Sequence, residues 1–103
     1  MLLGAHNDIH KTEAAFGSVH NYYEKLVYEQ LWRASDKAQA DSNFLADVLC
    51  VALNRLPPRY VRHDVDMTFF LSPIELDEIL DKVAQAVNEA LSYVENRGHS
   101  RQT

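Results

Sequence analysis

The chain is short of cysteine, glycine, proline and long apolar runs, and each shortage excludes a class of protein. A single cysteine, Cys50, forms neither an internal disulfide nor a cysteine-based metal cluster, which is typical of a reduced compartment. Because it lies in an apolar segment, we expect it to be buried. No stretch reaches the roughly 18 apolar residues of a membrane span, and residues 1–8 lack the basic start and apolar core of a secretory signal. We therefore expect a cytoplasmic protein that has no membrane partner.

Basic residues are also in short supply, with ten Lys and Arg against fifteen Asp and Glu and a net charge of −5. This field repels nucleic acid and anionic lipid, so a nucleic acid polymer is not expected as a partner. Any phosphate-bearing ligand needs a local cluster of basic side chains.

A chain of 103 residues with 47% hydrophobic residues supports one domain with one core.

Few glycines and prolines leave few places to turn, which favours long helices. Residues 1–20 are weakly patterned, and we interpret them as a loosely ordered arm with one or two helical turns. Asn21, with Glu24 three residues later, predicts the start of a helix that runs to about Lys37. Its aromatic residues either form a wide stripe on the core or face a second surface such as a dimer partner: Tyr22, Tyr23, Tyr28 and Trp32.

A second helix is predicted over residues 44–53, which are apolar apart from Asp47 and follow three capping residues at 41–43. Such a helix should be surrounded by protein on nearly all sides. Asn54 is its expected end, and Pro57 and Pro58 then forbid a helix, so residues 56–60 should form a rigid, extended connector. Residues 60–71 suit either a short strand or an ordered loop.

The last helix has the clearest start, because Ser72 and Glu75 form a capping box with Pro73 at the first helical position. We expect it to end at residues 96–98, to span about 36 Å and to overhang onto another subunit, with residues 98–103 as a frayed tail. Its apolar residues recur at steps of four and three, like a coiled-coil seam: Leu76, Leu80, Val83, Val87, Ala90 and Val94.

These elements predict a mainly α fold. We expect a small domain of three to four helices over residues 21–97, with an extended Pro-Pro connector, that forms a homodimer.

No nucleophile elbow, phosphate-binding loop, dinucleotide fingerprint or zinc-protease motif is present, so we expect neither an enzyme nor a catalytic residue. No cofactor is expected. His6, His10 and His20 lack the spacing and the cysteine partners of a metal site.

Basic side chains do gather at the connector, where Arg55, Arg59 and Arg62 lie within residues 54–63. Guanidinium groups bind phosphate through paired hydrogen bonds, and the two prolines lower the entropy lost in presenting Arg55 and Arg59 together. The segment therefore suits a compact anionic ligand. Alternatively, Arg55 or Arg59 pairs with Asp47, because a carboxylate in an apolar helix needs a partner.

The run over residues 47–61 resembles the signature of the late-competence protein ComFB family, which has an acidic residue, an apolar helix, an Asn-basic pair, a proline-containing turn and a tyrosine. The similarity extends over roughly residues 20–95. It implies a small, helical, dimeric, cytoplasmic regulatory protein, and some relatives are described as receptors for cyclic dinucleotides. Asn54, Arg55, Arg59 and Tyr60 are the motif positions carried over as ligand-binding residues, and Arg62 is added by its local charge. Asp47, Pro57 and Pro58 are carried over as structural residues.

The sequence leaves two hypotheses. In the first, a homodimer binds cyclic di-GMP or cyclic di-AMP through its arginines. In the second, the protein is a homodimeric adaptor for a protein partner, without a small-molecule ligand, and uses its aromatic surface and the acidic outer face of the last helix. Certain relatives carry a cysteine cluster before the apolar helix, but this chain has Gln39, Asp41 and Phe44 there, so no metal is expected.

Overall fold

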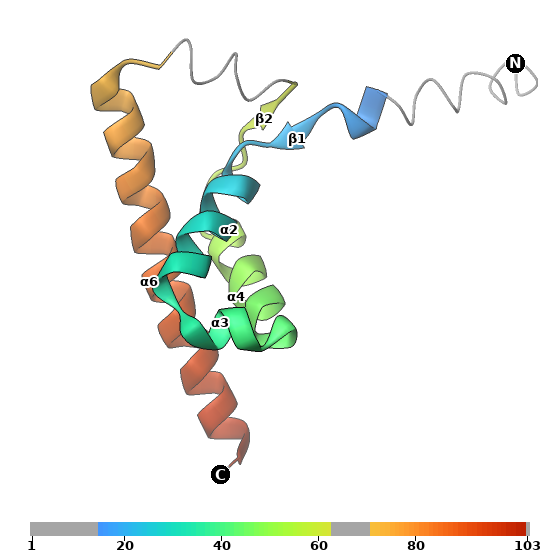
Figure 1. Ribbon diagram of the computed structural model, residues 1–103, viewed down its shortest axis with the longest axis vertical. Coiled ribbons are helices and arrows are strands. Elements are labelled where there is room, and N and C mark those ends of the chain that lie inside the picture. Colours follow the sequence, from blue (N-terminus) through green and yellow to red (C-terminus); the bar gives the residue numbers. More distant parts are fainter. Residues whose placement is uncertain (1–14, 63–70, 103) are drawn as a thin grey trace, which may run out of the picture.

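The computed structural model describes residues 15–62 and 71–102, with side chains as far as Arg97. Two shorter helices pack on the middle of one long helix, which extends past them at both ends, and a third, very short helix packs on those two (Figure 1). This architecture confirms the mainly helical fold. In chain order the elements are β1 (His20–Asn21), α2 (Tyr23–Ala34), α3 (Asp36–Ala40), α4 (Ser42–Asn54), β2 (Tyr60–Val61) and α6 (Pro73–Gln102).

Strands β1 and β2 pair antiparallel, with His20 opposite Val61 and Asn21 opposite Tyr60. The end of the predicted loose arm is thus held in a two-stranded sheet and is preceded by a helical turn at residues 15–17. Of the two alternatives left open for residues 60–71, the strand is found at the first two positions. Residues 1–14 and 63–70 lie outside the described part of the chain, so the predictions for them stay predictions.

The first predicted helix is in fact two helices, α2 and α3, with a break at Ser35. Ser35 has an extended backbone, and its hydroxyl accepts a hydrogen bond from the Ala38 amide at 3.1 Å. The prediction of one helix to Lys37 was therefore wrong. The physical reason is that a serine hydroxyl competes for backbone amides and favours a helix N-terminus over a helix interior.

The four aromatic residues of this region divide between the core and the surface. Tyr22 and Tyr23 are buried. Tyr28 and Trp32 are 43% and 41% exposed, and their rings stack with centroids 5.9 Å apart. The wide core-facing stripe is therefore not formed, and Tyr28 and Trp32 present a second surface of α2.

Helix α4 begins after Asp41, whose Oδ1 accepts hydrogen bonds from the Asn43 and Phe44 amides, and it ends at Asn54 as predicted. Within this chain it is not surrounded on nearly all sides. Phe44, Val48 and Ala52 are buried, but Ala46, Asp47 and Cys50 are exposed. Cys50 is therefore a free thiol at the surface and not a buried side chain. It follows Val48 by two positions, which places it about 200° around the helix from the buried face.

Helix α6 starts with the predicted capping box, in which the Glu75 amide donates to Ser72 Oγ at 3.2 Å and the Ser72 amide donates to Glu75 Oε1 at 3.4 Å. The predicted end was wrong, because the helix continues through Gly98 to Gln102. One glycine costs a helix only about 1 kcal/mol, and no proline follows it. Thirty helical residues extend about 45 Å. The radius of gyration is accordingly 17.4 Å, whereas a compact chain of this length has about 13 Å.

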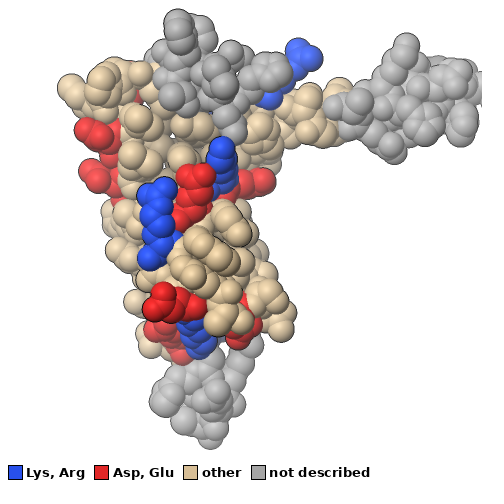
Figure 2. Space-filling view, viewed as in Figure 1, with Lys and Arg blue, Asp and Glu red and all other residues tan. Residues whose placement is uncertain are grey.

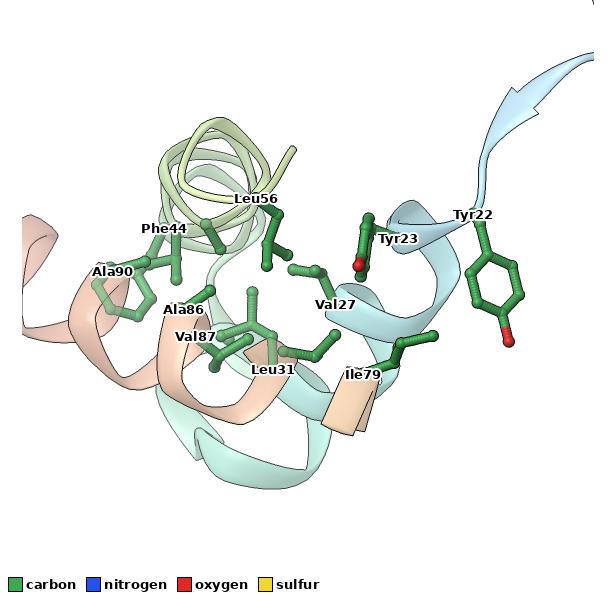
Figure 3. Close-up of a cluster of buried hydrophobic side chains, with 14 residues drawn as sticks. Tyr22, Tyr23, Val27, Leu31, Phe44, Leu56, Ile79, Ala86, Val87 and Ala90 are labelled. Atoms are coloured by element: carbon green, nitrogen blue, oxygen red, sulfur yellow. The ribbon is translucent and has the colours of Figure 1, made fainter. Parts of the chain in front are cut away.

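The core forms where α2, α4 and α6 meet (Figure 3). The middle of the predicted α6 seam, Val83, Val87 and Ala90, is buried there against side chains of the two shorter helices. Toward the start of α6 the seam opens, since Leu80 is 45% exposed. The seam is therefore used mainly to hold the chain's own helices together, and Leu80 is its exposed member.

Replacing Leu31 by alanine tests the core. Leu31 is fully buried, so Leu31→Ala should lower the free energy of unfolding by about 2–5 kcal/mol. The control is Leu80→Ala, which removes the same atoms from a half-exposed position and should cost under about 1.5 kcal/mol. Urea denaturation at fixed protein concentration measures both. Equal losses for the two variants would contradict the assignment of Leu31 to the core.

Candidate functional site

Asn21 anchors the segment that carries the predicted site. This residue is buried, and its Oδ1 accepts hydrogen bonds from the Tyr23 amide at 3.2 Å and the Arg59 amide at 3.0 Å. The Tyr22 amide donates in turn to the Arg59 carbonyl at 2.6 Å. Both polar backbone groups of Arg59 are thus bonded to the start of α2. The sequence showed Asn21 only as a helix cap, because no local signal indicates a partner 38 residues away.

Arg59, Tyr60 and Arg62 leave this anchored backbone as exposed side chains, and Tyr60 is 68% exposed. Within residues 15–62 and 71–97, neither the Arg59 nor the Arg62 side chain has a hydrogen bond or an ion pair. The described part of the chain thus neutralises neither guanidinium group. Pro57 and Pro58, also exposed, lie between α4 and β2 in a segment without regular secondary structure, and the predicted rigidity of this connector stays a prediction.

Arg55 lies in a different environment from the other two arginines. Its Nη1 is 3.3 Å from Glu89 Oε2 on α6, and its guanidinium carbon lies 5.7 Å from the centre of the Tyr93 ring. An internal ion pair was one of the two alternatives, but the partner is Glu89 and not Asp47, which is exposed and forms no ion pair among the described residues. The side chains of Arg55 and Glu89 are 39% and 47% exposed, so the pair stabilises the fold by no more than about 1 kcal/mol.

Helix α6 contributes three residues near Arg55 that the sequence analysis missed: Glu89, Tyr93 and Arg97. The Arg97 Nη1 donates to the Tyr93 hydroxyl at 2.8 Å, and the Arg97 guanidinium carbon lies 5.5 Å from the centre of the Tyr93 ring. The one signal in the sequence was their spacing, because residues four apart share a face of a helix. Nothing in that spacing indicated that Arg55 would join them.

Asn54 is used within its own helix. Its amide Nδ2 donates to the Cys50 carbonyl at 2.9 Å and lies 3.6 Å from the Cys50 Sγ, so the side chain satisfies a carbonyl of the last turn of α4. A ligand role for Asn54 stays a prediction.

The basic side chains on the visible face lie next to acidic ones and do not form one continuous patch (Figure 2).

Neither a metal centre nor a membrane span is found in the part of the chain that the structure describes. No group of three or more His, Cys, Asp or Glu residues there is placed to hold a metal ion. None of the described helices is long and apolar enough to cross a bilayer. His20 lies in β1, and the other two histidines of the arm fall outside the described residues.

Replacing Asn21 tests the anchor of Arg59. Asn21→Ala leaves one buried and one part-buried amide without this acceptor and should lower the free energy of unfolding by about 1–3 kcal/mol. The Arg59 amide should also exchange its hydrogen faster, which NMR measures residue by residue. Asn21→Asp is the matched control, because it keeps an oxygen at the same position. Unchanged protection of Arg59 in the alanine variant would contradict this anchor.

The comparison with protein-family models agrees with the resemblance found in the sequence. The family model described as late competence development protein ComFB matches residues 20–98. The match starts at β1 and includes the anchor at Asn21, the three short helices, the arginine connector and α6 as far as Gly98. The comparisons with curated proteins and with solved structures give no match. Because the family model covers well over half of the chain, this protein belongs to the ComFB family of late competence development proteins.

Proposed function

We propose that this protein is a non-enzymatic cytoplasmic regulator that binds a cyclic dinucleotide, either cyclic di-GMP or cyclic di-AMP, at the connector. The observation that carries the proposal is the pair Arg59 and Arg62, two exposed guanidinium groups that have no partner among the described residues, on a backbone that Asn21 anchors. Guanidinium groups bind phosphodiesters through paired hydrogen bonds. Tyr60 offers an exposed ring on which a base can stack. Anchoring Arg59 before binding lowers the entropy that the complex loses.

Titration calorimetry with cyclic di-GMP and cyclic di-AMP tests this function. Arg59→Ala and Arg62→Ala should each raise the Kd about tenfold, because each removes a charged hydrogen-bond donor to phosphate. Arg33→Ala is the control, since Arg33 is an exposed arginine on α2, where it pairs with Glu29. Absence of heat from either nucleotide at tens of micromolar, with folded protein, would end the proposal.

The same proposal includes a homodimer. The uncovered side of α4 supports it. This surface has no charged residue and continues from the core: Leu45, Ala46, Leu49, Cys50 and Leu53. A second copy of the same face would complete the burial that the apolar sequence of α4 calls for.

A charge placed on this face tests the dimer. Light scattering should give twice the chain mass of 11.8 kDa for the unchanged protein and the single mass for Leu49→Asp, since a dimer cannot bury an unpaired carboxylate. Ser92→Asp, at an exposed position of α6, should leave the dimer intact. A monomeric unchanged protein at high micromolar concentration would disprove the homodimer.

The second candidate function is a homodimeric adaptor for a competence-related protein partner, without a small-molecule ligand. It is favoured by the stacked, half-exposed pair Tyr28 and Trp32, which is the kind of aromatic surface that interfaces use. The acidic outer face of α6 is the other surface that this function would use: Glu75, Asp77, Glu78, Asp81 and Glu89.

Affinity purification from lysate tests the adaptor. Changing Tyr28 and Trp32 to serine should remove at least one co-purified protein, because the apolar contact area is lost. Phe16→Ser is the control, since Phe16 is an exposed aromatic residue outside this stacked pair. The same set of partners for both variants would count against the adaptor function.

A further inference from the structure

Two arginines from different elements meet at one tyrosine on α6, and we propose that Arg55, Tyr93 and Arg97 form a binding site for a phosphate group. The inference deepens the proposed function and rests on it for the identity of the ligand: this cluster takes one phosphodiester of the nucleotide, and Arg59 and Arg62 take the other. The motif contributes Arg55 alone, so Tyr93 and Arg97 are additions made by the tertiary structure.

The tyrosine holds the two cations together. Their guanidinium carbons lie 5.7 and 5.5 Å from the centre of the Tyr93 ring, within the range of cation–π attraction. Arg97 is oriented further by its hydrogen bond to the Tyr93 hydroxyl. The two distances put the guanidinium carbons at most about 11 Å apart, so the two positive charges together attract an anion more strongly than either does alone. The arrangement is therefore suited to binding a phosphate oxygen.

Donors remain available at both arginines. A guanidinium has five N–H donors. The contacts found here use the Nη1 group of Arg55, toward Glu89, and the Nη1 group of Arg97, toward Tyr93. Both side chains are exposed, so the remaining donors can reach a ligand. A phosphate can bind without breaking either contact.

Glu89 acts as the internal counter-ion of this site. Its Oε2 pairs with Arg55, and its Oε1 accepts a hydrogen bond from Gln85 at 3.1 Å, which keeps the carboxylate near the cluster. Two arginines and one carboxylate leave a local charge of +1 on a chain whose net charge is −5. Because a carboxylate repels an arriving phosphate, Glu89 lowers the affinity of the site and its removal should raise it.

The position along the chain links the cluster to the connector. Arg55 and Arg59 are four residues apart, so their Cα atoms lie at most about 14 Å from each other. Two arginine side chains can bring their guanidinium groups closer than that. One ligand with two phosphodiesters can therefore contact Arg59 with one of them and the Tyr93 cluster with the other.

Calorimetry with cyclic di-GMP tests the site in the full chain. Arg97→Gln and Tyr93→Leu should each weaken binding about tenfold, because each removes a donor or the ring that orients it. Glu89→Gln should tighten binding about threefold, an effect that a merely destabilised fold does not produce. Arg33→Gln is the matched control on α2. Circular dichroism checks that every variant is folded.

The outcomes separate this inference from the function on which it rests. If Arg59→Ala weakens binding while Arg97→Gln and Tyr93→Leu do not, the cluster is not a ligand site and the proposed function stands. If the unchanged protein binds no cyclic dinucleotide, inorganic pyrophosphate is titrated and the Arg55 and Arg97 Nε–H signals are followed by NMR. Saturable shifts that disappear in Arg97→Gln would support a phosphate site for another ligand. Absence of shifts would overturn it.

Discussion

The hydrogen bonds of the Asn21 carboxamide are the constraint on which the arrangement of this protein depends. One oxygen accepts from the first residue of α2 and from Arg59, and the Tyr22 amide bonds to the Arg59 carbonyl. The start of α2 is thereby joined to the segment after α4 that carries Arg59. Without an acceptor at this buried position, the connector after α4 would be held to the start of α2 only by the Tyr22–Arg59 hydrogen bond and the pairing of β1 with β2, and Arg59 would be less firmly placed.

The long helix α6 organises the rest. Its middle buries small and β-branched side chains against α2 and α4, and it carries Glu89 and Tyr93 to Arg55 at the end of α4. The same helix thus builds the core on one side and a charged cluster on another, because residues three and four apart return to the same face. Its extent beyond the shorter helices, together with the uncovered apolar side of α4, leaves surfaces that suit a second copy (Figure 1).

The three arginines of the connector have separate roles in this arrangement. Arg55, which precedes the two prolines in the sequence, contacts a carboxylate and an aromatic ring of α6. Arg59 and Arg62, which follow the prolines, are exposed. A cyclic dinucleotide has two phosphodiesters, and the proposed division assigns one to each group of cations. This distribution of charge is the observation that supports the proposed phosphate-bearing ligand.

The sequence by itself determined the helical class, the capping box at Ser72, the end of α4 at Asn54 and the family, because these depend on local patterns along the chain. It left open whether Arg59 pairs internally. It also predicted wrongly one helix through Ser35, a buried Cys50 and a helix end at residues 96–98, where local preferences are weak. Only the tertiary structure decided that Asn21 bonds Arg59 and that Arg55 pairs with Glu89 and not with Asp47. Those partners are 38 and 34 residues apart, so they meet only when the packing of α2, α4 and α6 brings their backbones together.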